Sequence, residues 1–264
     1  DRLIFTSCMA PNMDGLGQAI ARYVGDRLSM ATTFVNDIPW PEREARLDVG
    51  EIHVGWICGL PYVWKADQPT ATVSLLAAPV MAGDRYQGRP VYFSDVVVQR
   101  DRPYQSVADL RGCSWAYNEP RSHSGYYVTR AYLASQGYGS GFFGQAVESG
   151  AHQRSLQLIL SGDIDASAID STVLEVELQR DPSIAEQIRV IGTFGPSPMP
   201  PWVVSNQLPS ALVSDLRSLF LTLHTDPHGR ALLAQWNMSR FVEVGDRDYD
   251  PIRHMAKQAE TVKL

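Results

Sequence analysis

The stretch Ser94–Tyr126, "SDVVVQRDRPYQSVADLRGCSWAYNEPRSHSGY", contains two strand-like segments, a short helix-like segment and a polar turn in close succession. The β-branched residues of 91–100 and the apolar residues of 113–118 predict strands, and 106–112 predicts a short helix between them. The polar turn then leads into a helix that starts at Ser122. A strand, a helix and a second strand in this order are typical of an α/β protein.

The same alternation extends along most of the chain. Apolar residues at helical spacing predict a helix in 15–30, and "GLPYVW" in 59–64 is interpreted as a turn because of its glycine and proline. Further strands are predicted in 2–9, 31–37, 53–59, 72–81, 164–170 and 188–195, and further helices in 43–52, 155–162, 171–181, 210–225 and 228–237. This order predicts mostly parallel sheets flanked by helices, which bind ligands beyond the carboxyl ends of their strands.

Two segments, 91–101 and 192–204, are candidates for connections between two domains. They enclose a middle segment of about domain size. We therefore expect a discontinuous outer lobe, residues 1–93 and 200–264, and a middle lobe, residues 94–199, with a ligand cleft between them.

The composition excludes several classes of protein. The net charge is −6 and there is no basic tract, so nucleic acid is not an expected partner. The longest apolar stretch, 73–83, is too short to cross a bilayer and contains a proline. The sequence starts at Asp1 without a signal peptide or an initiator Met, which we interpret as a mature or trimmed chain.

The three cysteines, Cys8, Cys58 and Cys113, have no CxxC spacing. Free buried thiols are the default interpretation, and one disulfide is the alternative in an oxidising compartment.

The turn Ser122–Gly125, "SHSG", places more hydrogen-bonding groups at a helix start than one cap requires. Either serine could be the N-cap residue. The alternative is a binding site, because the free N–H groups and the positive end of the helix dipole suit an anion. The hydroxyls beside them would add donors, and Gly125 would let a ligand approach the backbone.

Ser94–Tyr126, together with "SLQLILSGDIDASAIDS" in 155–171 and "DPHGRALLAQWN" in 226–237, resembles the periplasmic binding proteins of phosphonate, phosphite and phosphate-type ABC transporters. The shared pattern has a Ser-x-x-Asp-Leu-Arg/Lys-Gly helix, a strand, and a Ser-x-Ser-Gly turn into a helix. The resemblance covers nearly the whole chain and implies a type II periplasmic-binding-protein fold. It also implies that two lobes close on a small oxyanion, without catalysis. The middle residue of the turn is His123, where the family commonly has Thr.

Further candidate ligand-binding residues surround this turn. His152 precedes a helix at a place where the family often has a histidine, and Asp170 ends a strand, where N-capping of the next helix is the alternative. The outer lobe and the connections are expected to supply aromatic side chains, for which core packing is the alternative in every case. In full, the candidates are Ser122, His123, Ser124, His152, Asp170, Tyr92, Tyr62, Trp40, Trp56 and Trp202.

No metal, cofactor or catalytic residue is predicted. His224 and His228 have the spacing of a helical metal pair, but Asp226 and Pro227 are typical of an N-cap and a first helical residue, so a new helix begins between them. An enzyme would use Ser124, His152 and Asp170 as nucleophile, base and orienting acid, yet no G-x-S-x-G elbow or P-loop surrounds them.

The expected partners are a small ligand and an ABC transporter permease. A membrane sensor kinase is the alternative partner, and a small organic molecule is the alternative ligand. We expect a monomer located in the periplasm or anchored by a lipid outside the inner membrane.

Overall fold

The computed structural model describes residues 2–264, which divide into two compact units. Unit 1 consists of the chain up to Val91 together with Pro198–Asp250, and unit 2 consists of Tyr92–Ser197 together with Pro251–Leu264. The last helix therefore groups with unit 2, whereas the sequence assigned all of 200–264 to the outer lobe. In unit 2 the tail is held by Arg130, whose Nε donates to the carbonyl of Val262 at 2.6 Å.

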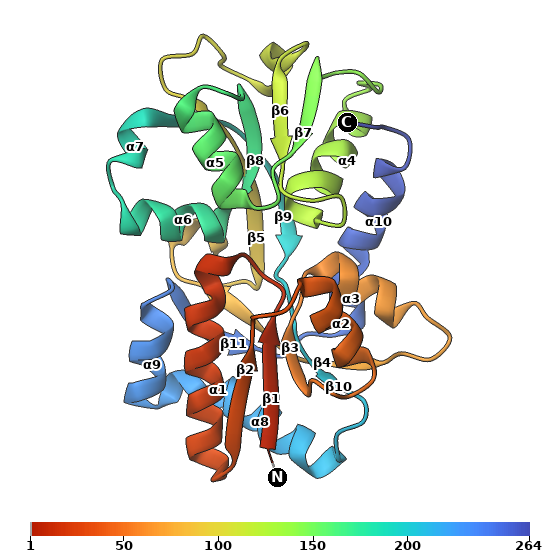
Figure 1. Cartoon of the computed structure of the whole chain (residues 1–264), viewed down its shortest axis with the longest axis vertical. Helices are drawn as coiled ribbons and strands as arrows, with labels where there is room; N and C mark the ends of the chain where they lie inside the picture. The colour runs from red at the N-terminus through yellow and green to blue at the C-terminus, as the bar shows by residue number, and fades with distance from the viewer. Residues whose placement is uncertain (1) are drawn as a thin grey trace. The chain divides into compact units, whose positions relative to one another are not determined.

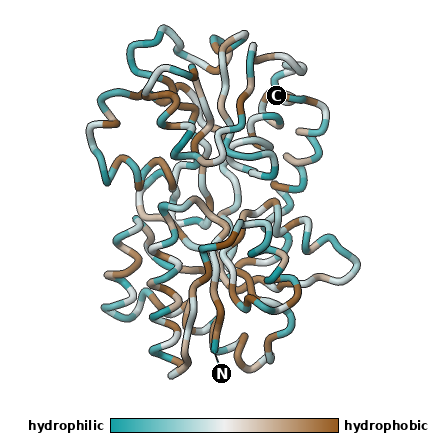
Figure 2. Tube along the Cα trace, in the orientation of Figure 1, coloured by the Kyte–Doolittle hydropathy of each residue, from teal (hydrophilic) through white to brown (hydrophobic). Residues whose placement is uncertain are grey.

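The sheet of unit 1 has six strands in the order β11-β4-β10-β3-β1-β2. The strands are β1 (Arg2–Ser7), β2 (Ala31–Val35), β3 (Val54–Trp56), β4 (Val73–Met81), β10 (Trp202–Ser205) and β11 (Met238–Val242). Its helices are α1 (Asp14–Leu28), α2 (Trp40–Asp48), α3 (Gly59–Ala66), α8 (Ser210–Thr222) and α9 (Pro227–Ala234) (Figure 1). Figure 2 colours the hydrophobic residues of the chain brown, and most residues of β1 are buried.

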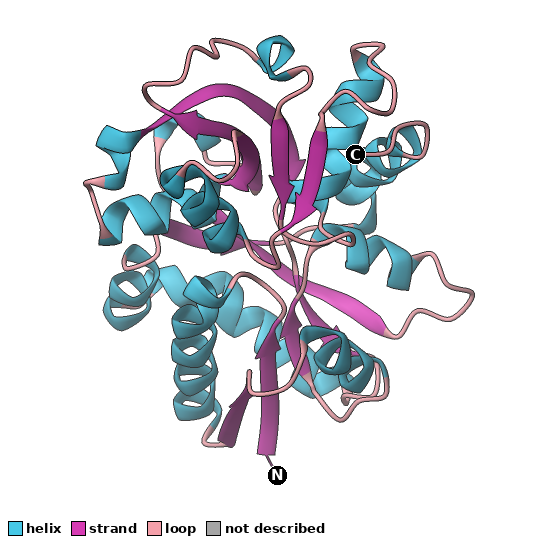
Figure 3. Ribbon diagram, turned by 45° about the horizontal axis from the view of Figure 1, so that its top comes forward, coloured by secondary structure: helices cyan, strands magenta, loops and turns pink. Residues whose placement is uncertain are grey.

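The sheet of unit 2 has five strands in the order β7-β6-β8-β5-β9. The strands are β5 (Val91–Gln99), β6 (Ser114–Tyr117), β7 (Gln145–Glu148), β8 (Ala166–Asp170) and β9 (Ile188–Pro198). The helices are a π-helical turn (His123–Tyr127), α4 (Val128–Ser135), α5 (His152–Ser161), α6 (Ser171–Arg180), α7 (Ile184–Gln187) and α10 (Asp250–Ala259). In both units the strands are flanked by helices (Figure 3).

The two faces of the unit 2 sheet are covered by separate hydrophobic clusters. Val96 and Val98 of β5 lie in a cluster with Trp115, whereas Val97 between them lies in a cluster with Leu156. Alternate residues of a strand point to opposite faces of the sheet. Because both faces are buried at this point, β5 needs consecutive apolar residues there.

The sheets are mixed, which corrects the expectation of mostly parallel strands. β1 pairs in parallel with β2 and β3, but β10 is antiparallel to β3 and β4, and β5 is antiparallel to β8. The reason is connectivity, because β5 and β10 follow the points where the chain passes from one unit to the other. Strands joined by an α-helix within one unit run parallel to each other. A strand that enters a sheet from the other unit is not bound to this direction.

Local signals account for most element boundaries. The carboxylate of Asp226 accepts from Gly229 N at 3.0 Å with Pro227 in the first turn, which confirms the helix start predicted between His224 and His228. The turn expected in 59–64 is instead part of helix α3. Pro61 is compatible with this helix because it stands in the first turn, where proline is tolerated.

Candidate functional site

The turn Ser122–Gly125 forms the centre of the candidate site in unit 2. Ser122 is the N-cap, and its Oγ accepts from Gly125 N at 3.2 Å. The backbone first makes a π-helical turn, in which Tyr127 N donates to Ser122 O, and then continues as α4. One serine thus provides the cap, which leaves Ser124 for another role.

Ser124 is hydrogen-bonded to His152. The distance from Ser124 Oγ to His152 Nε2 is 2.8 Å, and Ser122 Oγ lies 3.3 Å from Ser124 Oγ. β6 and β7 are parallel neighbours, so their carboxyl ends meet at one edge of the sheet. The turn follows β6 and His152 begins the helix after β7, which places both at the edge where α/β sheets bind ligands.

His123, the middle residue of the turn, contacts a different strand. Its Nε2 lies 3.0 Å from Ser197 Oγ near the end of β9, and both residues are fully buried. This contact has no local sequence signal because 74 residues separate the two positions.

Both imidazoles are neutral at physiological pH. Burial lowers the pKa of His123 and the pKa of His152 to about 4. Each ring therefore carries one proton, and the tautomer decides which nitrogen donates.

Seven buried side-chain polar atoms of unit 2 have no hydrogen-bond partner among residues 2–264. Four of them bear on this site: His123 Nδ1, His152 Nδ1, Ser94 Oγ and Asn118 Oδ1. Ser94 is paired in register with Asp170, and Asn118 directly follows β6. Unpaired buried polar atoms cost free energy, so a bound ligand that pairs with them would stabilise the site.

Gly125 is required at its position by its neighbours. A Cβ atom there would lie 2.0 Å from Asn118 Oδ1 and 3.2 Å from His152 Cε1. Asn118 and His152 therefore approach the same point of the turn, and only glycine leaves room for both.

Asp170 is the N-cap of α6. Its Oδ1 accepts from Thr172 N at 2.9 Å and from Thr172 Oγ1 at 2.7 Å. Burial raises the pKa of Asp170 to about 6, against the lowering effect of these hydrogen bonds. Its carboxylate already serves the capping role that the sequence left open.

The aromatic candidates stand on five different elements. Trp56 and Trp202 stack on each other in the core of unit 1, with ring centroids 5.6 Å apart. Tyr62 lies in α3, and its hydroxyl donates to Asp246 Oδ1 at 2.9 Å. Trp40 is half-buried at the first position of α2, and Tyr92 is buried near the start of β5 in unit 2.

Sequence reasoning missed Ser94, Asn118 and Ser197. None has a local motif, although Asn118 stands at the carboxyl end of a predicted strand, which is a usable signal.

Residues 2–264 contain no group of three or more His, Cys, Asp or Glu side chains that could hold a metal ion. Within the same residues, no helix has the length and hydrophobicity needed to span a membrane. All three cysteines are free thiols.

Solved structures with the same fold define the class of protein. A binding-protein component of an ABC phosphonate transporter from Pseudomonas aeruginosa superposes with a TM-score of 0.84 and 17% identity, over 98% of this chain and 86% of that one. A Prochlorococcus marinus protein in complex with methylphosphonate superposes with a TM-score of 0.82 and 17% identity, over 99% of both chains. The chain therefore has the type II periplasmic-binding-protein fold, as the sequence predicted.

Sequence comparison then identifies the family. The model of the phosphonate ABC transporter periplasmic substrate-binding protein family matches residues 10–249, so the chain belongs to this family. The phosphonates-binding periplasmic protein of Escherichia coli is 22% identical over 220 residues. That alignment covers 81% of this chain but only 63% of the Escherichia coli protein. The family consists of binding proteins, not enzymes, which confirms the prediction against the enzymatic alternative.

Proposed function

We propose that this chain captures a phosphonate, or a related small oxyanion such as phosphite or phosphate, at the turn Ser122–Gly125. One observation carries the proposal. Two serines and two neutral histidines are buried together at the start of a helix, and the histidine Nδ1 atoms have no protein partner among residues 2–264. Donors that are already held in place suit an oxyanion, because hydrogen bonds to a charged group are the stronger kind.

The family supports the chemistry of this ligand. The relatives that resemble this chain are phosphonate-binding components, and one was solved with methylphosphonate. The turn has the Ser-x-Ser-Gly pattern that carried the resemblance in the sequence.

A calorimetric and thermal-shift screen tests the proposal. The ligands are methylphosphonate, aminoethylphosphonate, phosphite, phosphate and a set of small organic acids. We expect saturable binding of at least one phosphorus oxyanion. Ser114→Ala is the matched control variant, since Ser114 Oγ bonds Asp165 Oδ2 at the amino end of β6, away from the turn. Binding of organic acids alone would replace the oxyanion proposal with the organic-ligand alternative.

Capture between the two units is part of the proposal. A ligand that contacts both units stabilises the closed form by its differential affinity. Small-angle scattering with saturating ligand should then show a smaller radius of gyration, and an unchanged radius would contradict closure.

The proposed partner is an ABC transporter permease, with the chain acting as a monomer in the periplasm, either free or anchored by a lipid. A membrane sensor kinase is the competing partner. Reconstitution with the permease encoded nearest to the gene would distinguish the two by ligand-stimulated ATP hydrolysis.

A further inference from the structure

We propose that Ser197 is a positioning residue whose hydroxyl supports one tautomer of His123, the one in which Nδ1 of this ring presents an N–H donor to the bound oxyanion. The inference rests on the proposed function, because it assigns roles within the same site. It adds one ligand-contacting atom, His123 Nδ1, and one residue that acts through it.

The geometry leaves two arrangements for the pair. In the first, His123 Nε2 carries the proton and donates to Ser197 Oγ, and Nδ1 is a bare acceptor. In the second, Ser197 Oγ donates to Nε2, and Nδ1 carries the proton. The Nε2 to Oγ distance of 3.0 Å fits both arrangements, since a hydroxyl can donate or accept.

An oxyanion distinguishes the two arrangements. Nδ1 is buried and has no partner among the described residues, so it is unsatisfied in either tautomer until a ligand arrives. A deprotonated oxygen of a phosphonate accepts hydrogen bonds and cannot donate. Only the second arrangement offers it an N–H group, so binding selects that tautomer.

Ser197 is suited to hold the second arrangement. It is fully buried, and its backbone is fixed in β9, so its hydroxyl stays opposite the ring without competition from solvent. Its Oγ–H supplies the proton that Nε2 must accept. Alanine at this position would leave Nε2 as a bare buried acceptor whenever Nδ1 donates to the ligand.

Nitrogen NMR of the chain labelled with ¹⁵N-histidine tests the proposal, with methylphosphonate as the probe. The chain has 6 histidines, and His123→Gln assigns the relevant pair of resonances by their loss. At saturation we expect the ¹⁵N chemical shift of His123 Nδ1 to be that of a protonated ring nitrogen, and that of Nε2 to be that of an unprotonated one. A ligand complex in which Nε2 carries the proton would overturn the proposal.

Calorimetry gives a second and independent readout. Ser197→Ala should weaken methylphosphonate binding about tenfold, as expected for one net hydrogen bond. Ser114→Ala should bind like the unmodified chain. Unchanged affinity in Ser197→Ala would contradict the role of Ser197, and the tautomer measurement on the unmodified chain decides the question if this variant does not fold.

The two proposals fail in different ways. If the unmodified chain binds none of the phosphorus oxyanions, the proposed function fails and this inference falls with it. If methylphosphonate binds but the tautomer or the Ser197→Ala affinity is not as expected, only this inference fails.

Discussion

The hydroxyl of Ser124 and the imidazole Nε2 of His152 lie 2.8 Å apart, although 28 residues separate them in the chain. They meet because β6 and β7 are adjacent and parallel, and each residue stands in the first turn of the helical segment that follows its strand. Ser122 serves as the cap beside them, so its role and that of Ser124 can be separated by mutation.

Ser124→Ala should weaken oxyanion binding by roughly 1.5–3 kcal/mol, about ten- to a hundredfold, because a hydrogen bond to a charged group is lost. The lost donor is either the Ser124 hydroxyl itself or His152 Nδ1–H, which needs Ser124 to donate to His152 Nε2. Ser122→Ala should instead lower the free energy of unfolding by about 1 kcal/mol through loss of the cap. Calorimetry measures the affinity, and urea unfolding measures the stability. Equal affinity in Ser124→Ala and the unmodified chain would exclude Ser124 from the ligand site.

Gly125→Ala should reduce affinity because the new Cβ would collide with Asn118 Oδ1, 2.0 Å away, and displace either that side chain or the turn. Gly139→Ala is the matched control, since nothing lies within 4 Å of a Cβ there. Adding Asn118→Ala to Gly125→Ala should recover part of the free energy of unfolding lost in Gly125→Ala if the collision is the cause. No effect of Gly125→Ala on binding would contradict the tight packing of this turn.

The stability of the chain should rise with pH between about pH 4 and 6.5. The pKa of both His123 and His152 is about 4 in the folded chain against 6.5 ordinarily, so the unfolded state binds more protons in this window. Each histidine contributes at most about 1.4 kcal/mol per pH unit. This contribution is complete above pH 6.5 and is lost as the pH falls towards 4.

Asp170 acts in the opposite direction. Its pKa is about 6 in the folded chain against 3.8 ordinarily, so its contribution to stability decreases as the pH rises through that range. Two histidines outweigh one carboxyl group, which gives the net rise. In urea unfolding across the window, His152→Gln should flatten the profile and Asp170→Asn should steepen it. A profile that falls from pH 4 to 6.5 would contradict the burial of neutral histidines.

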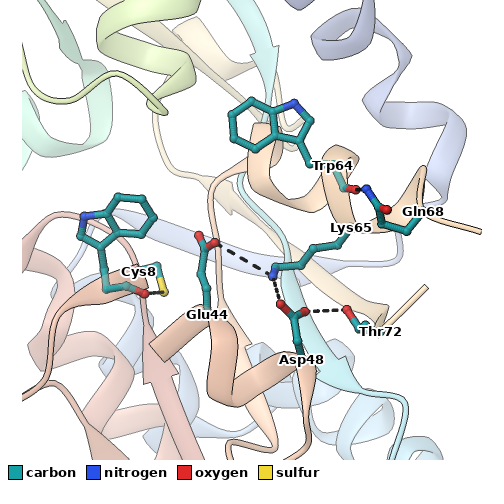
Figure 4. Close-up of polar contacts among 8 residues, drawn as sticks. Cys8, Glu44, Asp48, Trp64, Lys65, Gln68 and Thr72 are labelled. Atoms are coloured by element: carbon teal, nitrogen blue, oxygen red, sulfur yellow. Dashed lines mark hydrogen bonds and ion pairs between the residues drawn. The ribbon is translucent and has the colours of Figure 1, made fainter. Parts of the chain in front are cut away.

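Lys65→Met should destabilise unit 1 by about 3 kcal/mol, because it removes the charge between two carboxylates. Lys65 Nζ lies 2.6 Å from Asp48 Oδ2 and 4.0 Å from Glu44 Oε2, and the Glu44 side chain is only 5% exposed (Figure 4). Asp48 is more exposed, which places the expected cost at the lower end of the range for buried pairs.

The control for this substitution is Arg46→Met. Arg46 pairs with Glu42 at 2.6 Å, but both side chains are nearly half exposed, so the loss should stay below about 1 kcal/mol. Urea unfolding measures the free energy of unfolding of both variants. If Lys65→Met and Arg46→Met lower it equally, burial does not strengthen the Lys65 ion pairs.

Local sequence determined the class of fold, because the period of apolar residues and the capping residues act within a few positions. Asp226 and Pro227 marked the start of α9, and Ser122 marked the start of the helical segment that carries the proposed site. The turn itself was also found in the sequence, since its surplus of donors lies within four consecutive residues.

Tertiary structure decided which strands are antiparallel and which distant side chains contact the residues of the proposed site. Ser197 has no signal in its neighbourhood, and its contact with His123 exists only because β9 returns to the sheet of unit 2. The capping role of Asp170 and the stacking of Trp56 on Trp202 were each one of two alternatives in the sequence. A residue type allows several contacts, and the pairing of strands determines which of them the folded chain makes.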